Sequence, residues 1–233
     1  MSQKLFKWKH FESEIIMLCV LWHLKYPLSY RMLVDMMQER GLKLTHTTIM
    51  RWIHQYSPII SEKVREHIKP TNDSWRMDET YLKFKGKNAY LYRAVDSEGK
   101  KIDFFVPEHR DKDAVKKFFR KALKASYNQQ PRVITTDKYA ATEVAIHEMI
   151  YSGINSVKTT LRKVKYLNNI IEQDHRFIKR KVKPMLGFDS FETAEKTICG
   201  IEAMHMIRKG QVEEIQSVLS EVKFFNKIMG ISA

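Results

Sequence analysis

The most restrictive feature of the sequence is a change in hydrophobic period near residue 70. Before this point, apolar residues recur at the three- to four-residue spacing of amphipathic helices. Between Trp75 and Val106 they fall instead into three short runs that alternate as strands do, separated by turn residues at 85–88 and 96–99. Three such runs predict an antiparallel meander. The chain must therefore build a sheet beside a separate set of helices.

After residue 110, helical patterns alternate with short apolar runs, which gives the order βββαβαβα. Strands are expected at 75–84, 89–95, 102–106, 131–137 and 154–159, and helices at 111–125, 140–150, 167–183, 189–209 and 212–227. Three antiparallel strands followed by two strands with helical crossovers are the order of an RNase H-like domain. We therefore predict an α/β fold for residues 71–233, with a mixed five-stranded sheet flanked by helices and followed by carboxy-terminal helices.

The hydrophobic pattern of residues 1–70 predicts an all-α module with helices at 12–25, 29–41 and 46–56. Ser29 is a suitable N-cap, and Gly41 a suitable C-cap before a short connection. Helix, short glycine-containing turn and helix form the helix-turn-helix pattern of DNA-binding proteins. The alternative is a small helical bundle used for dimer contacts. On the DNA-binding interpretation, the residues facing away from the apolar side would read the major groove, and these are His46, Thr48, Arg51 and Gln55.

The charge favours a polyanionic partner. Lys and Arg number 41 against 27 Asp and Glu, a net charge of +14, so nucleic acid is the first candidate and an anionic membrane surface the second. No apolar run approaches the length of a membrane helix. Cys19 and Cys199 are too few for a disulfide framework or a four-thiolate zinc site and suit a reducing cytoplasm. No glycine-rich nucleotide-binding motif is present.

Three carboxylates stand out when this architecture is imposed. Asp78 lies inside the first strand, Asp137 follows the fourth strand, and Glu172 lies on the long late helix. An ionised side chain in mid-strand is costly unless it is solvated, paired or bound to metal. Converging carboxylates would repel one another until divalent cations neutralise them, and Mg²⁺ prefers such oxygen ligands. Two ions at such a site suit in-line attack on a phosphodiester.

Four segments in order carry a family resemblance: 75–81 (WRMDETY), 86–96 (GKNAYLYRAVD), 135–137 (TTD) and 168–176 (NNIIEQDHR). They resemble the DDE transposases of bacterial insertion sequences, most closely those of insertion sequence family six. The 34 residues between Asp137 and Glu172 match that family's spacing, and Lys179 occupies the position of its basic residue seven places after the glutamate. The resemblance covers nearly the whole chain, including the helix-turn-helix.

The resemblance implies roles for these residues. Asp78, Asp137 and Glu172 would hold two Mg²⁺ ions, with Mn²⁺ as a substitute, and Lys179 would assist them. The enzyme would bind the terminal inverted repeats of its element, cut the 3′ ends and join them to target DNA, replicatively and with cointegrates as products. It would act in the bacterial cytoplasm at the nucleoid, as a homodimer or larger assembly on double-stranded DNA.

The residues themselves support a phosphate-binding surface on the late helix. Residues 158–183 hold nine Lys and Arg against two acids. At 100° per residue, Glu172, Arg176 and Lys179 share one helix face, and Arg180 adjoins it. We expect Arg176, Lys179 and Arg180 to contact DNA. A basic helix face that is merely solvated is the alternative.

Two other functions remain open at this point. One is a DNA-binding regulator or an inactive transposase relative, and the other is an RNase H-like nuclease of repair or RNA processing. Among other residues, Glu79 should point to the opposite face from Asp78 and be either structural or an indirect support of the metal ligands. Asp103 competes weakly for a metal role. His175 is expected either to touch DNA or to lie on the surface.

Overall fold

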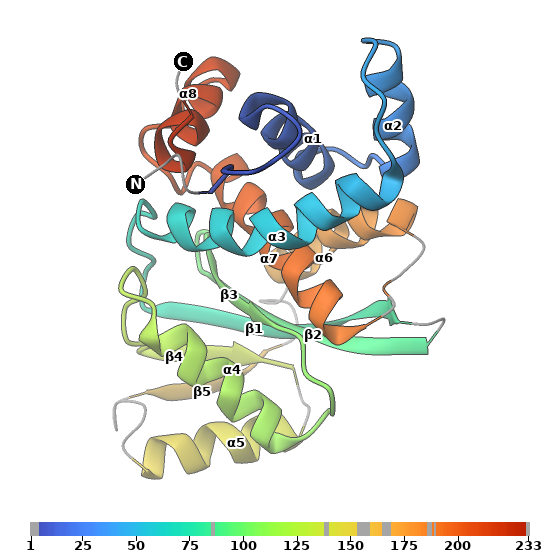
Figure 1. Ribbon diagram of the computed structural model, residues 1–233. Coiled ribbons are helices and arrows are strands. Elements are labelled where there is room, and N and C mark those ends of the chain that lie inside the picture. Colours follow the sequence, from blue (N-terminus) through green and yellow to red (C-terminus); the bar gives the residue numbers. More distant parts are fainter. Residues whose placement is uncertain are drawn as a thin grey trace. The chain divides into compact units, whose positions relative to one another are not determined.

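The computed structural model describes residues 5–84, 87–137, 140–152, 159–164, 169–185, 188 and 190–231. The chain divides into two compact units, and each is described by itself (Figure 1). One unit consists of Met1–Ile68, Lys181–Leu186 and Glu192–Ala233, and the other of Lys69–Arg180 and Gly187–Phe191. None of the helices in the described part of the chain is both long and apolar enough to cross a membrane.

The first unit is helical. It contains α1 (Ser13–Lys25), α2 (Tyr30–Gln38), α3 (His46–Arg65), nearly all of α7 (Phe191–Arg208) and α8 (Val218–Met229). A Cβ placed on Gly200 of α7 would lie 2.7 Å from Ser57 Cβ and 2.8 Å from a Leu24 methyl, so α7 packs closely on α3 and α1. The carboxy-terminal helices therefore belong to the same packing unit as the amino-terminal helices. The division into a DNA-binding module and a catalytic domain at residue 70 stays a prediction.

The starts of α2 and α3 have the capping chemistry that the sequence indicates. The Ser29 hydroxyl accepts a hydrogen bond from the Met32 amide at the start of α2. The last residue of α2 is Gln38, with Glu39 at the C-cap in place of Gly41. Gly41 follows in the turn, where it adopts φ +76°, a conformation that favours glycine, and its amide donates to the Gln38 carbonyl. Thr45 caps α3 by accepting from the Thr48 amide at 3.2 Å. The short α2–α3 connection is therefore fixed by local contacts.

One boundary in this unit differs from the expected one. The sequence predicts that α3 ends near Tyr56 because Pro58 follows, yet α3 continues to Arg65 with Pro58 inside it. Proline in a helix interior costs about 3 kcal/mol. The extra turns bury Ile60 and Val64 completely, and each buried aliphatic side chain is worth about 1.5–3 kcal/mol. Tertiary burial therefore outweighs the local penalty.

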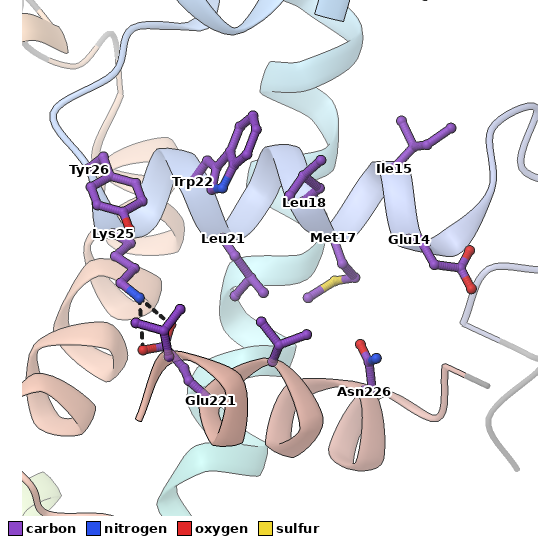
Figure 2. Close-up of a pocket in the computed structure, with 12 residues that line it drawn as sticks. Glu14, Ile15, Met17, Leu18, Leu21, Trp22, Lys25, Tyr26, Glu221 and Asn226 are labelled. Atoms are coloured by element: carbon purple, nitrogen blue, oxygen red, sulfur yellow. Dashed lines mark hydrogen bonds and ion pairs between the residues drawn. The ribbon is translucent and has the colours of Figure 1, made fainter. Parts of the chain in front are cut away.

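An apolar cavity of about 350 Å³ lies between α1 and α8 (Figure 2). Leu18, Leu21 and Trp22 line it from α1, and Val218 and Val222 line it from α8. At one end the Lys25 ammonium contacts the Glu221 carboxylate at 2.9 Å.

The second unit is built on a five-stranded sheet of order β3-β2-β1-β4-β5. Its strands are β1 (Ser74–Phe84), β2 (Lys87–Asp96), β3 (Lys101–Phe105), β4 (Val133–Thr136) and β5 (Thr160–Lys163). The first three pair antiparallel, while β1–β4 and β4–β5 pair parallel. This mixed sheet with helical crossovers confirms the RNase H-like fold class. The predicted fifth strand, 154–159, lies mostly outside the described residues, and the described strand begins at Thr160.

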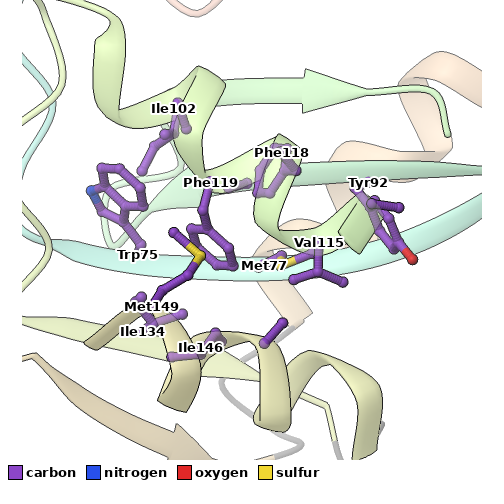
Figure 3. Close-up of a cluster of buried hydrophobic side chains, with 14 residues drawn as sticks. Trp75, Met77, Tyr92, Ile102, Val115, Phe118, Phe119, Ile134, Ile146 and Met149 are labelled. Atoms are coloured by element: carbon purple, nitrogen blue, oxygen red, sulfur yellow. The ribbon is translucent and has the colours of Figure 1, made fainter. Parts of the chain in front are cut away.

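Helices α4 (Lys112–Lys124) and α5 (Ala140–Tyr151) cover one face of the sheet (Figure 1). Trp75 and Met77 of β1 point to this face and pack on Phe118 and Phe119 of α4 and Met149 of α5 (Figure 3). Since side chains alternate along a strand, the even-numbered residues of β1 face the other way. That second face receives α6 (Asn169–Val182).

Candidate active site

The pairing of β1 with β4 relates the positions of the first two predicted carboxylates. The two parallel strands have Ser74 opposite Val133, and Arg76 opposite Thr135. Continued by two residues, this register would bring Asp137 beside Asp78. Paired residues of adjacent strands point to the same face, so a strand continued to Asp137 would direct this acid to the same face as Asp78. Asp78 is partly buried, and Asp137, just beyond the end of β4, is exposed.

The Asp78 carboxylate is held from two directions. One oxygen, Oδ1, accepts a hydrogen bond from the Glu79 amide at 2.9 Å. The other, Oδ2, lies 3.2 Å from Nε2 of His175 on α6. The Asp78 side chain keeps 16% of its surface exposed, whereas His175 keeps only 7%. The expectation that His175 touches DNA or lies on the surface is therefore wrong, because the rotation of α6 directs this side chain toward the sheet.

The remaining predicted residues lie on the solvent side of α6. Ile171 and Ile178 are fully buried, and together with the contact of His175 to Asp78 they fix the rotation of the helix. The exposed residues of this helix include Glu172, Arg176, Lys179 and Arg180. Glu172 comes one turn before His175, so the helix that contacts Asp78 also carries the third acid.

Two buried residues in this site have no counterpart in the sequence-based prediction. Arg93 of β2 pairs across the strands with Asp78 and is completely inaccessible. Its guanidinium contacts Asp174 Oδ2 at 2.6 Å and His175 Nδ1 at 3.3 Å. The signal was available in part, since an arginine inside an apolar strand needs a partner. The hairpin register also sets Arg93 opposite Asp78.

Glu79, the acid next to Asp78 in β1, is partly buried. It points away from Asp78 and forms an ion pair with Arg110, whose guanidinium also stacks over Tyr90. Burial raises the pKa of Glu79, and the negative charges of Asp137 and Asp78 raise it further, while Arg110 acts to lower it. Asp137 and Asp78 are thus both within electrostatic range of this carboxylate. Asp103 is buried and pairs with Lys121 at 3.5 Å, which leaves it no place at this site.

The donor chemistry of Asp78 and Asp137 fits a divalent ion. Both supply the hard carboxylate oxygens that Mg²⁺ prefers. Each Asp78 oxygen accepts a hydrogen bond and has a second lone pair for a cation. Within the described residues, no three His, Cys, Asp or Glu side chains lie close enough together to hold a metal ion. The conformation described therefore does not gather Glu172 with the two aspartates.

The candidate base-reading residues lie on α3. His46, Arg51 and Gln55 are exposed, as the helix-turn-helix interpretation requires. Thr48 is half-buried, and its hydroxyl is 2.9 Å from that of Thr45 within the cap. Gln55 accepts a hydrogen bond from Lys9 at 2.8 Å.

A mixed sheet of this order, with Asp78 inside β1 and Asp137 directly after the parallel strand β4, is typical of an RNase H-like phosphoryl-transfer domain. A family model described as a DDE domain matches residues 72–211, more than half of the chain. A solved structure of the HTLV-2 integrase catalytic core domain in complex with magnesium is also similar. It has 18% identity and a TM-score of 0.40, over 55% of this chain and 84% of that one.

Two relatives from Staphylococcus aureus extend the match to the amino-terminal helices. The transposase for insertion sequence-like element IS431mec is 36% identical over 212 residues, which cover 91% of this chain and 92% of the relative. The transposase for insertion sequence element IS257 in transposon Tn4003 is 35% identical over the same coverage. The chain belongs to the DDE transposases of insertion sequence family six, of the IS431/IS257 type.

Proposed function

We propose that this transposase binds the terminal inverted repeats of its own insertion sequence, cleaves the DNA at the 3′ ends and joins those ends to target DNA. The observation that supports the proposal is the β1–β4 register, with Arg76 opposite Thr135, which would bring Asp78 and Asp137 side by side if continued by two residues. The resemblance adds the replicative outcome, with cointegrates as products. The enzyme would act on double-stranded DNA in a bacterial cell as a homodimer or larger assembly.

Asp78, Asp137 and Glu172 would hold two divalent ions, Mg²⁺ or Mn²⁺. When bound, these ions neutralise the carboxylates and activate oxygen for attack on phosphorus. Glu172 must join the two aspartates from its exposed position on α6. Because the His175 contact ties this helix to Asp78, a local adjustment of the first turn of α6 is the movement we propose.

The protein's cations would hold the DNA phosphates. Lys179, seven residues after Glu172, shares the exposed side of α6 with Arg176 and Arg180. These side chains would place a phosphate next to the acids and strengthen DNA binding through counterion release. Lys179 is the one we assign to the reacting strand.

Residues 1–70 would supply the sequence-reading module, and residues 71–233 the catalytic domain. The exposed positions of His46, Arg51 and Gln55 on α3 support direct contact with bases. Thr48 would contribute from the capped first turn, where its hydroxyl is already engaged.

The test is a strand-transfer reaction with a duplex carrying the element's terminal repeat, supercoiled plasmid and Mg²⁺. Asp78→Asn, Asp137→Asn and Glu172→Gln should each reduce joined products at least about 100-fold. The loss of a metal ligand should remove several kcal/mol of transition-state stabilisation. End binding, measured by gel shift, should change less than about threefold, because none of the three is assigned to base contact.

Asp113→Asn is the matched control, since Asp113 is an exposed acid at the start of α4, on the other face of the sheet. It should join DNA as the wild type does. If wild-type protein binds the repeat specifically but gives no cleaved or joined product, the protein is a DNA-binding regulator. If it cuts DNA without joining ends, it is a nuclease.

A further inference from the structure

A line of buried polar contacts runs from the interior of the sheet unit to the Asp78 carboxylate. Asp174 contacts Arg93 at 2.6 Å, Arg93 contacts His175 Nδ1 at 3.3 Å, and His175 Nε2 contacts Asp78 Oδ2 at 3.2 Å. Arg93, Asp174 and His175 keep 0%, 1% and 7% of their side-chain surface exposed. Three side chains so well enclosed, with their polar atoms joined, have little freedom to rearrange.

The chemistry of arginine sets the direction of these hydrogen bonds. A guanidinium only donates, so Nδ1 of His175 must accept from Arg93. A neutral imidazole that accepts at Nδ1 carries its proton on Nε2. That proton points at Asp78 Oδ2, a carboxylate oxygen that accepts it.

We propose that His175 is a positioning residue for Asp78: held by Arg93, it donates from Nε2 to Oδ2 and fixes the orientation of the carboxylate. The inference rests on the proposed function, in which Asp78 is a metal ligand. Hydrogen bonds to ligating carboxylates fix their orientation and strengthen metal binding. His175 lies one turn after Glu172. One helix thus delivers the third acid and orients the first.

Two amide substitutions distinguish the contributions of the two ring nitrogens of His175. In His175→Gln, the amide nitrogen reaches about as far as Nε2 and can still donate to Asp78. In His175→Asn, the amide ends at the level of Nδ1, so it can still accept from Arg93 but cannot reach Asp78. If the role of His175 is only structural, the buried Arg93 needs an acceptor, and His175→Asn should be the better tolerated substitution. If His175 positions Asp78, the donor to Asp78 is needed, and His175→Gln should be the better tolerated one.

The first measurement is Mn²⁺ binding by the free protein, followed by electron paramagnetic resonance of unbound Mn²⁺. We expect His175→Asn to bind Mn²⁺ about 10–100-fold more weakly than wild type, and His175→Gln to fall closer to wild type than to Asn. Strand transfer should follow the same order. Equal losses in the two variants, or a smaller loss in Asn, would overturn the proposal. Thermal unfolding of each variant shows whether it is folded.

The second measurement does not depend on a variant. In the metal-free wild-type protein, two-bond ¹H–¹⁵N spectra of the histidine rings report which nitrogen carries the proton. His175 should show an unprotonated Nδ1 and a protonated Nε2, and the opposite tautomer would refute the proposal. Asp78→Asn separates the two hypotheses. Full strand transfer in Asp78→Asn refutes the proposed function, whereas loss in Asp78→Asn with equal activity of the two His175 variants refutes only the positioning role.

Discussion

At the scale of single residues, the buried pair of Arg93 and Asp174 should be the most sensitive point of the sheet unit. Removing one partner of a buried ion pair leaves an uncompensated charge and costs about 3–5 kcal/mol. We therefore expect Asp174→Asn to lower the free energy of unfolding by about that amount in urea denaturation. The neutral double variant Arg93→Met, Asp174→Leu should recover most of the loss, because it buries no charge.

The control for this prediction is Glu221→Gln, which breaks the ion pair with Lys25 on the helical unit. Those side chains keep 14% and 25% of their surface exposed, so solvent screens the pair and its loss should cost less than about 1 kcal/mol. A loss in Asp174→Asn no larger than that of the control would show that Arg93 finds another partner or solvent.

The residue scale also shows what the sequence could and could not predict. Asp78 and Asp137 could be proposed as metal ligands because an acid inside or just after an apolar strand is unusual, and the strand order then places β1 beside β4. The role of His175 was not found. Its neighbour Glu172 is exposed while His175 is buried, and only the rotation of α6 on the sheet decides between these outcomes. That rotation depends on contacts with β1 and β2, far away in sequence.

At the scale of elements, the end of α1 depends on a side chain from another helix. Pro27 has no amide hydrogen and so cannot donate to the His23 carbonyl four residues earlier. The ammonium of Lys181, at the end of α6, donates to that carbonyl instead. Lys181 is 3% exposed, and burial lowers its pKa to about 7.

This environment predicts a pH dependence of stability. The unfolded chain keeps the Lys181 proton up to about pH 10, while the folded protein releases it near pH 7. The unfolded state therefore binds more protons in this window, and the free energy of unfolding rises with pH by up to about 1.4 kcal/mol per unit. Lys181→Met should lose this rise in urea denaturation between pH 7 and 9.

Lys223→Met is the control, since Lys223 is exposed on α8. It should keep the wild-type pH profile. His23 does not interfere, because burial lowers its pKa to about 3, far below the window. Parallel pH profiles for wild type and Lys181→Met would mean that the amine titrates alike in the folded and unfolded chain.

Element boundaries were predictable where local chemistry sets them and not elsewhere. Ser29, Thr45 and Asp111 cap α2, α3 and α4 through their own side chains, and capping is visible in sequence. The start of α8 was placed too early. Val212 forms a β-bridge with Ile68 instead of starting a helix, a pairing between residues that are distant in the chain.

At the scale of the whole molecule, the excess of cations should act mainly through one helix. The exposed cations Arg176, Lys179 and Arg180 lie on α6, the helix that packs on the face of Asp78. Exposed cations also lie on α4, which covers the opposite face. A net charge of +14 attracts DNA to both. Only the α6 cations are assigned to phosphates.

A pair of triple variants with the same loss of charge separates direct contact from general attraction. One changes Arg176, Lys179 and Arg180 to glutamine, and the other changes Lys117, Arg120 and Lys124 of α4. Affinity for random duplex DNA is measured by fluorescence anisotropy at several salt concentrations. Each phosphate contact contributes about 0.9 to the slope of log affinity against log salt. The α6 variant should therefore have a slope shallower by up to about 2.7, while the α4 variant keeps nearly the wild-type slope. Equal changes in both would show that the DNA senses only the net charge, and α6 would then not be the surface on which phosphates lie.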